Sequence, residues 1–272
     1  MVFRRALAIL WCASLISSTV LAAAEWEKTV TTGIRGDFQN PRSLKAIYDF
    51  GWSGMVAATA EIHLGKSDDR LQLEGTGQTI GVVRSVWKFD VRHHALADAA
   101  TLRPILLHQV EEARGKTITT DLAFSSKGVI RTRADSKAKK PARPKNFDCP
   151  SVFDLYSALL YIRSQPLVDG DVHRIVVYPA SGAYLATITV AAREPLTVAA
   201  GTYKAVKFDI QLSRIGKKRE LEPHKKFSRA SVWISDDADR LLLRIEARVF
   251  VGTVFAELQS VRFIEEKPSP HA

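Results

Sequence analysis

Hydrophobic and polar positions alternate with a period of two along much of this chain. Between residues 56 and 64, apolar side chains occupy positions 58, 60, 62 and 64, and polar ones occupy positions 59, 61 and 63. Residues 241–251 repeat the pattern, with an apolar side chain at every odd position and Arg or Glu at 244, 246 and 248. Alternation of this kind predicts strands that have one buried face and one solvated face.

Segments with strand character recur at short intervals between turn residues. Before residue 127 the expected strands cover residues 44–64, 70–75, 81–91, 102–111 and 117–124, and after residue 170 they cover 171–178, 183–192, 201–212, 227–235, 241–251 and 253–263. Strands at this spacing, without alternating helices, indicate an all-β, mainly antiparallel fold rather than a βαβ fold. We expect one β-rich domain over residues 44–263, either barrel-like or built from two packed barrel-like units.

One helix is expected near the middle of the chain, over residues 151–165. Ser151 is a suitable N-cap, Asp154 completes a capping-box pattern, and Pro166 ends the helix. Apolar residues recur at helical spacing, which predicts an amphipathic helix with one face against the sheet. This helix would act as a plug or lid, and together with a basic loop over residues 127–148 it would join possible halves at 44–126 and 171–263.

The N-terminus has the layout of a secretory signal. Arg4 and Arg5 precede an apolar run, and residues 22–24 are three alanines, which is typical of a cleaved signal peptide. An uncleaved membrane anchor is the alternative, although the run is short for a membrane span. We expect cleavage after residue 24, a periplasmic protein, a loosely held segment at 25–43 and a C-terminal tail at 264–272.

Cysteine content and charge narrow the function classes. Cys12 lies in the signal, so Cys149 remains alone, and no internal disulfide is possible. Cleavage would lower the formal net charge from +10 to +8 because Arg4 and Arg5 are lost with no acid. A basic exported chain favours anionic surfaces, whereas nucleic acid is a poor partner for it. No second apolar run has the length of a transmembrane helix.

The most basic stretch lies just before the helix. Residues 127–145 contain eight Lys or Arg residues, with Asp135 as the only acid, together with two prolines. This composition predicts a mobile loop, either a simple solvated connection or a dock for anionic lipid or an acidic partner. The docking residues would be Arg131, Arg133, Lys139 and Lys140.

No motif for catalysis or metal binding is present. The seven histidines lack metal-site spacing, the Asp236–Asp237 segment is typical of a turn rather than a calcium loop, and no Gly-x-Ser-x-Gly occurs. We therefore expect no enzyme activity, no metal and no cofactor. A glycosidase remains open, since its two carboxylates meet only in the folded chain.

Four residues are candidates for ligand binding: Trp52, Tyr156, Arg163 and Trp233. Arg163 lies late in the expected helix, where it could stabilise the helix dipole or anchor a ligand head group. Trp52, Trp87 and Trp233 lie on expected strands with apolar neighbours, so each could be a core residue or a platform on which a ligand stacks.

Four segments resemble an exported bacterial family called domain of unknown function 3108. The matching segments are residues 48–54, 153–163, 200–205 and 232–237, and the resemblance covers approximately residues 44–263. It departs from the family at Leu242 and Leu243, where a proline-containing approach to the last strands is expected. The resemblance implies a predominantly β-stranded envelope protein without an established activity, so it supplies no catalytic residues.

Three functions remain open after these observations. The first is a non-enzymatic envelope protein that binds an apolar or lipid-like molecule inside a barrel, since barrels of this size can enclose a ligand, or that takes part in maintaining the cell envelope. The second is a scaffold that docks on another envelope protein through a sheet edge or the basic loop. The third is a hydrolase of envelope polymers, which would need a cleft with two facing carboxylates.

Overall fold

A computed structural model describes residues 25–67, 69–223, 229–249 and 252–265. This part of the chain forms one large, mainly antiparallel sheet, as the alternating pattern predicts. The expected signal segment and most of the C-terminal tail lie outside the described residues. None of the helices in these residues combines the length and the apolar character that a membrane span requires.

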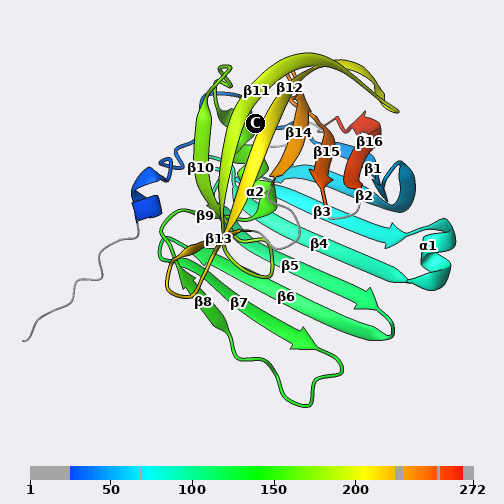
Figure 1. The fold of residues 1–272 in the computed structure, drawn as a ribbon, viewed down its shortest axis with the longest axis vertical. Helices are drawn as coiled ribbons and strands as arrows, with labels where there is room; N and C mark the ends of the chain where they lie inside the picture. Colours follow the sequence, from blue (N-terminus) through cyan, green and yellow to red (C-terminus); the bar gives the residue numbers. More distant parts are fainter. Residues whose placement is uncertain (1–24, 68, 224–228, 250–251, 266–272) are drawn as a thin grey trace, which may run out of the picture.

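The first half of the chain forms one half-sheet (Figure 1). Its strands follow one another in space in the order in which they occur in the sequence. They are β1 (Leu44–Trp52), β2 (Met55–Ser67), β3 (Arg70–Thr79), β4 (Phe89–Asp98), β5 (Pro104–Ala113), β6 (Lys116–Ser125), β7 (Gly128–Asp135) and β8 (Lys145–Asp148).

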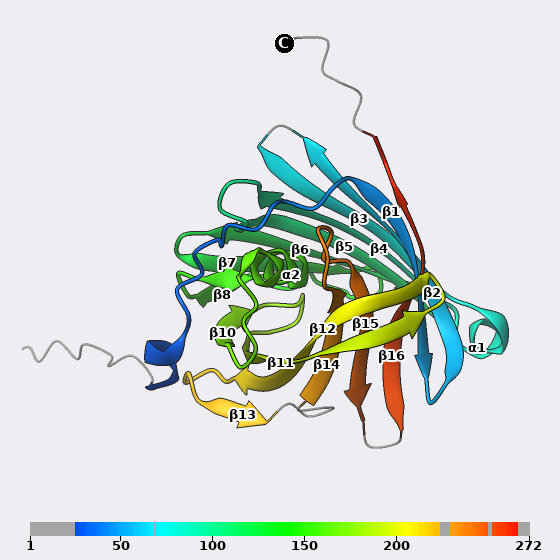
Figure 2. The same cartoon turned by 90° about the horizontal axis from the view of Figure 1, so that it is seen from above.

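The second half of the chain forms the other half-sheet, which faces the first (Figure 2). The neighbour order is β9-β10-β11-β12-β14-β15-β16, and β13 pairs with β12. The strands are β9 (Val152–Phe153), β10 (Val172–Val177), β11 (Tyr184–Val198), β12 (Gly201–Ile215), β13 (Leu221–Pro223), β14 (Arg229–Ser235), β15 (Leu242–Arg248) and β16 (Thr253–Phe263).

The first and last strands join the two half-sheets. β1 pairs with β16 over nine residue pairs, from Leu44 opposite Phe263 to Trp52 opposite Val254. The Tyr48 hydroxyl donates to the Leu242 carbonyl oxygen at 2.8 Å and ties this seam to β15. The sheet is therefore barrel-like but open, because β8 and β9 form its two edges and do not pair with each other in the described structure.

The helix α2 (Leu155–Ser164) lies between the two half-sheets (Figure 2). Tyr156 and Leu160 pack with the first half-sheet, whereas Tyr161 and Ile162 pack with the second. Eight of its ten residues are buried, so α2 buries more than the single apolar face that the helical spacing predicted. Because its side chains pack with both half-sheets, α2 is part of the core.

The start of α2 also differs from the prediction. The N-cap is Asp154 rather than Ser151, and the Asp154 carboxylate accepts a hydrogen bond from the Ser157 backbone N–H at 2.6 Å. Val152 and Phe153, expected in the helix, form β9 and pair in parallel with β10. The sequence β9–α2–β10 is thus a local βαβ unit, which the strand spacing did not predict.

The Asp154 carboxyl group should make stability depend on pH. Asp154 is fully buried, and burial raises the pKa of its carboxyl to about 6, although hydrogen bonds from Ser157 oppose the rise. Because the folded-state pKa exceeds the unfolded value, the stabilising contribution is complete below about pH 4 and is lost as the pH rises through 6.

Asp154→Asn keeps a good N-cap and removes this titration. Between pH 5 and pH 7.5, we expect the wild type to lose about 1 kcal/mol of stability relative to the variant, as measured by urea unfolding. A constant difference across this pH range would contradict a raised pKa for Asp154.

Two segments of the first half-sheet differ from the predicted structure. Residues 81–91, expected as a strand, form the short helix α1 (Gly81–Val86) followed by the start of β4. The expected basic loop at 127–148 contains β7 and β8, which pair with each other and extend the half-sheet to residue 148. Only residues 136–144 connect these two strands.

The N-terminal segment is held against the domain rather than loosely attached. It begins with the 3₁₀ helix η1 (Glu25–Thr29), in which Trp26 is buried and donates from Nε1 to the Arg219 carbonyl oxygen at 2.7 Å. The segment then crosses the end of α2, where the Phe38 N–H donates to the Ser164 carbonyl oxygen at 3.2 Å.

Candidate functional site

The four predicted ligand residues do not meet in one cavity. Tyr156 lies in the core between α2 and the first half-sheet, and Trp233 is buried in a separate cluster beside the β1–β16 seam. The Trp233 Nε1 donates to Glu194 at 2.6 Å. Trp52 is 42% exposed at the end of β1, and Trp87 is also exposed, so a core position is wrong for both.

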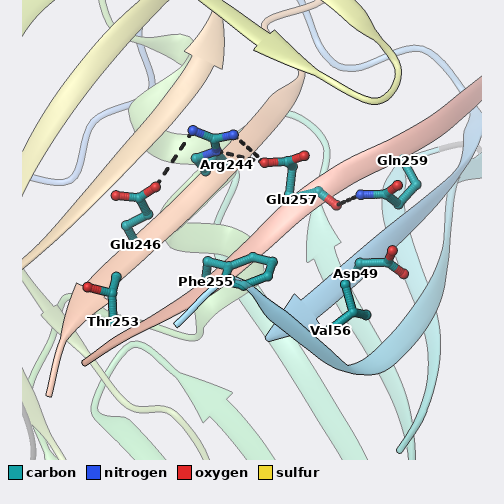
Figure 3. A pocket seen from close by; sticks show the side chains of 9 residues that line it. Asp49, Val56, Arg244, Glu246, Thr253, Phe255, Glu257 and Gln259 are labelled. Carbon is teal, nitrogen blue, oxygen red and sulfur yellow. Dashed lines mark hydrogen bonds and ion pairs between the residues drawn. The ribbon is translucent and has the colours of Figure 1, made fainter. Parts of the chain in front are cut away.

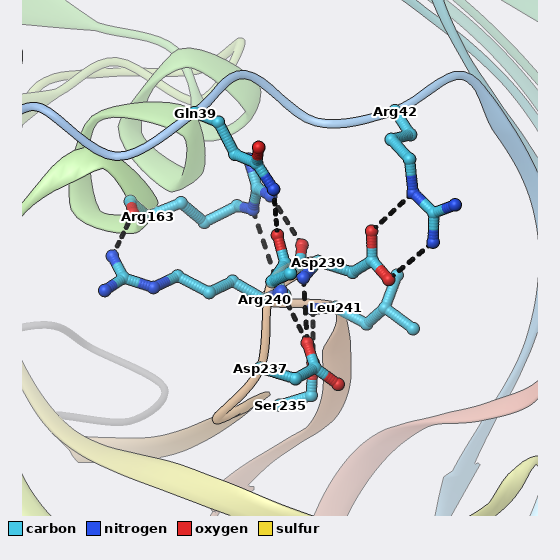
Figure 4. A network of polar contacts seen from close by, with 9 residues as sticks. Gln39, Arg42, Arg163, Ser235, Asp237, Asp239, Arg240 and Leu241 are labelled. Atoms are coloured by element: carbon cyan, nitrogen blue, oxygen red, sulfur yellow. Dashed lines mark hydrogen bonds and ion pairs between the residues drawn. The ribbon is translucent and has the colours of Figure 1, made fainter.

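Arg163 is buried in a network of contacts between α2 and the turn that connects β14 and β15 (Figure 4). Its guanidinium donates to the Arg240 carbonyl oxygen at 3.1 Å and to the Asp239 carbonyl oxygen. Arg240 donates in return to the carbonyl oxygens of Arg163 and Gln165. Burial and the nearby Arg240 charge lower the pKa of Arg163 to about 10. Its donors are directed at backbone carbonyls and not at a ligand site.

Side-chain contacts also stabilise the turn that Arg163 contacts. The Asp237 carboxylate accepts hydrogen bonds from the Asp239 and Arg240 backbone N–H groups at 2.9 and 3.0 Å. Arg42 makes a bidentate ion pair with Asp239 at 2.8 and 2.7 Å. The predicted turn at Asp236–Asp237 is confirmed, and its role is to connect α2, the N-terminal segment and the second half-sheet.

The four predicted docking residues occupy different environments. Arg131 lies on β7 and donates to the carbonyl oxygens of Ala180 and Ser181 at 3.2 and 3.0 Å, so its charge is used within the fold. Arg133 is an exposed residue of β7. Only Lys139 and Lys140 lie in the exposed connection between β7 and β8.

A pocket of about 590 Å³ lies on the outer face of the seam (Figure 3). Arg244 on β15 forms ion pairs with Glu246 at 3.6 Å and with Glu257 on β16. Asp49 of β1 is directly opposite Glu257 in the strand register, so both carboxylates line this pocket. A second outer pocket, of about 490 Å³, lies over β1 to β5 and is also largely polar.

The inner face of the first half-sheet is only partly covered by α2. Ten helical residues span about 15 Å. The strands β2 to β6 have ten to thirteen residues each and span about 33–43 Å. The residues that pack with α2 lie toward one end of these strands, among them Leu71, Ala95 and Leu122. The other end of the inner face stays uncovered by the helix.

The uncovered part combines small, apolar and polar side chains, which we call the inner-face site. The strand register and the alternation of side chains place its members on the same face as the helix-packing residues. They are partly exposed or have accessible polar atoms, and they are Ala58, Ala60, Ile62, Gly75, Gly77, Val91, His93, Gln109, Glu111, Ile118 and Thr120. The alanine and glycine residues on β2 and β3 add little side-chain bulk to this face.

Three polar residues form a row across the inner-face site. His93 on β4 is opposite Gln109 on β5, and Gln109 is opposite Thr120 on β6. Gln109 and Thr120 are only 7% and 4% exposed, yet neither side chain has a hydrogen-bond partner in the described residues. Neither residue has a polar atom that is both fully enclosed and unpaired. Their polar atoms therefore face accessible space. Burial lowers the pKa of His93, which favours the neutral imidazole.

Sequence reasoning missed this row. Each polar residue is visible as an interruption of apolar alternation, because Gln109 follows Leu107 and Thr120 precedes Leu122 on the same face. What the pattern lacks is the register between strands, which alone brings the three side chains together. In the described residues no group of His, Cys, Asp or Glu side chains is arranged to hold a metal ion.

Comparison with solved structures supports the fold. A beta-barrel-like protein of domain of unknown function DUF1849 from Brucella abortus matches 84% of this chain and 100% of its own length, with a TM-score of 0.56 at 9% identity. A protein with a YmcC-like fold from Bacteroides fragilis matches 84% of this chain and 99% of its own, with a TM-score of 0.34 at 10% identity. The first TM-score shows a shared fold, whereas the second is too low to indicate one.

Sequence comparison establishes the family. A search among curated proteins finds no match. The sequence model described as "Protein of unknown function (DUF3108)" matches residues 46–259, which include every strand that contributes to the inner-face site and most of β1 and β16. The chain therefore belongs to the DUF3108 family, as the four sequence segments indicated.

Proposed function

We propose that this protein is a non-enzymatic carrier of an apolar, lipid-like molecule in the cell envelope, and that the molecule lies on the inner-face site. The observation that carries the proposal is the extent of α2, which covers one end of the inner face and leaves the other end lined by small and apolar side chains. The signal-like N-terminus supports an envelope location.

The lining indicates the chemistry of the ligand. Ala60, Gly77 and Val91 are adjacent in the strand register and offer a low apolar surface for an acyl chain. Gln109 and Thr120 have unused donors and acceptors, so they would bind an uncharged polar group, such as an ester or a hydroxyl. Binding sites of this kind combine an apolar lining with a few directed polar groups.

The two alternative functions have less support. A scaffold that docks through a sheet edge would use β8 or β9, which have only four and two residues, and short edges are poor templates for strand addition. For a hydrolase, Asp49 and Glu257 both line the outer pocket, but Arg244 holds Glu257 in an ion pair. Oppositely charged side chains on neighbouring strands usually stabilise the sheet, so this ion pair is typical of a structural contact.

Bulk added on the inner face should block the ligand. A Cβ atom at Gly75 would meet its nearest neighbour, His93 Cβ, at 3.7 Å, so Gly75→Leu fits the strand while its side chain enters the inner-face site. We expect Gly75→Leu to weaken binding of a fluorescent acyl-chain probe at least about tenfold, since the leucine occupies the volume that the chain needs.

Gly65→Leu is the matched control. A Cβ atom at Gly65 would meet nothing within 4 Å, and the residue pairs with Gln72 on the outer face of the same two strands. The control should bind the probe like the wild type. Equal weakening in both variants, or wild-type protein that neither binds the probe saturably nor releases a lipid on solvent extraction, would refute the carrier function.

A further inference from the structure

The exposed apolar side chains of this protein gather at one end. Eight of the fifteen large hydrophobic residues that are exposed in the described structure lie on the β1–β2 turn, on α1 and its flank, and at the start of β16. We call this set the apolar rim: Phe50, Trp52, Met55, Val56, Val82, Val86, Trp87 and Val254. Exposed patches that combine several large apolar side chains usually mark an interaction site.

The elements of the rim adjoin one another. Trp52 is opposite Met55 across the β1–β2 turn and opposite Val254 on β16. The Ile80 N–H donates to the Ala57 carbonyl oxygen at 3.0 Å, which places α1 beside β2. Figure 2 shows α1 projecting from the sheet next to β2. The elements that carry the rim are therefore neighbours at one end of the sheet.

The projecting helix is fixed in place although its valines face solvent. Arg84 pairs with Asp90 at 2.8 Å, and Thr79 Oγ1 donates to the Trp87 carbonyl oxygen at 2.9 Å. Val82 and Val86, one helical turn apart, are each 83% exposed, which is more than any other large hydrophobic residue in the described chain. A rigid support thus presents two of the most exposed apolar side chains outward.

Basic residues lie at the same end of the first half-sheet. Because β3 to β7 are antiparallel neighbours, the β3–β4 connection, the β5–β6 connection and the end of β7 share one end. The exposed basic residues there are Lys88, Arg114, Lys137, Lys139 and Lys140. Three nearby acids already have partners, in the ion pairs Asp90–Arg84, Glu112–Arg92 and Asp135–Lys116. The end that carries the apolar rim therefore also carries an excess of exposed basic side chains, with Lys88 next to the rim and the others on the β5–β6 and β7–β8 connections.

We propose that this end of the molecule docks on a lipid surface with anionic head groups. The valines and indoles would enter the interfacial layer, where tryptophan is favoured, and the basic residues would contact the head groups. Charge complementarity and the projecting shape of α1 favour a lipid surface over a protein partner with a matching groove. The inference does not require the carrier function, because it depends on the outer rim and not on the inner-face site.

Vesicle flotation tests the proposal with a matched pair of variants. The purified protein should float with phosphatidylcholine vesicles that contain phosphatidylglycerol and much less with phosphatidylcholine alone. Val82→Ser/Val86→Ser should lower the association constant for the vesicles at least about tenfold, because two apolar side chains no longer enter the membrane interface. The control Val168→Ser/Val172→Ser changes valines that are 58% and 52% exposed outside the rim, and it should bind like the wild type.

A second measurement needs no apolar substitution. Brominated lipids should quench tryptophan emission in the wild type, and Lys139→Ser/Lys140→Ser should weaken binding several-fold and reduce its dependence on salt. Absence of flotation and quenching in the wild type would overturn the proposal. So would equal losses in the two valine pairs, because the effect would then not be specific to the rim.

Discussion

Leu160→Ala should lower the free energy of unfolding by about 3 kcal/mol, which is typical of a leucine removed from a packed core. Leu160 is 2% exposed and packs from α2 onto the inner face of the first half-sheet. A helix that closed a cavity as a movable lid would tolerate this change far better than a helix inside the core. Thermal or urea unfolding of the two proteins provides the measurement.

Leu155→Ala is the control on the same helix. Leu155 is 64% exposed, so the same chemical change should cost about 0.5 kcal/mol or less. Similar losses for the two variants would show that α2 is not buried on the side of Leu160, and the account of the helix as a fixed core element would then be wrong.

Arg163→Ala is also expected to cost about 3 kcal/mol. Each hydrogen bond from a charged donor contributes about 1.5–3 kcal/mol, and part of this is offset by the cost of burying the guanidinium. The substitution removes two such bonds and leaves the Asp239 and Arg240 carbonyls without their donor. The free energy of unfolding of Arg163→Lys should lie between those of the wild type and Arg163→Ala, since an ammonium group cannot match the planar donor geometry of the guanidinium.

The effect of Arg163→Ala should fall on stability and not on ligand affinity. Arg143→Ala, at an exposed position in the connection between β7 and β8, is the matched control and should leave the unfolding free energy nearly unchanged. A folded and stable Arg163→Ala protein that fails to bind the acyl-chain probe would instead favour the alternative in which Arg163 anchors a ligand.

The local alternation of apolar and polar residues predicted the strands, because each strand has one buried and one solvated face. In β15, Leu243 and Ala247 are buried as the alternation requires, while the intervening Arg244 and Glu246 line the outer pocket. The fold class is confirmed for the same reason. The family was indicated by the four matching sequence segments instead, and the sequence model confirms it. The alternation is a property of consecutive residues and needs no knowledge of partners.

Features that depend on distant partners could not be predicted in this way. Val152 and Phe153 followed a plausible N-cap, but pairing with β10 draws them into a strand. Arg131 and Arg133 suggested a solvated loop, yet pairing with β6 and β8 makes the segment a strand. In both cases tertiary contacts outweigh the local preference of the sequence.

The candidate site illustrates the same limit. Aromatic and cationic residues were chosen because they are typical ligand contacts, and the fold disperses them: Trp233 and Arg163 serve the core, whereas Trp52 lies on the apolar rim. The row of His93, Gln109 and Thr120 arises only when three strands align. Polar residues on an otherwise apolar face are the one signal that could have indicated it.

The most direct test of the carrier function is a map of ligand contacts by amide NMR. Titration of ¹⁵N-labelled protein with a medium-chain fatty acid ester should shift resonances of residues 58–62, 75–79, 89–93, 109–111 and 118–120, which carry the inner-face site. Resonances of Arg244, Glu246 and Glu257 in the outer pocket should remain in place. Shifts confined to the outer pocket, or no saturable shifts, would contradict the account.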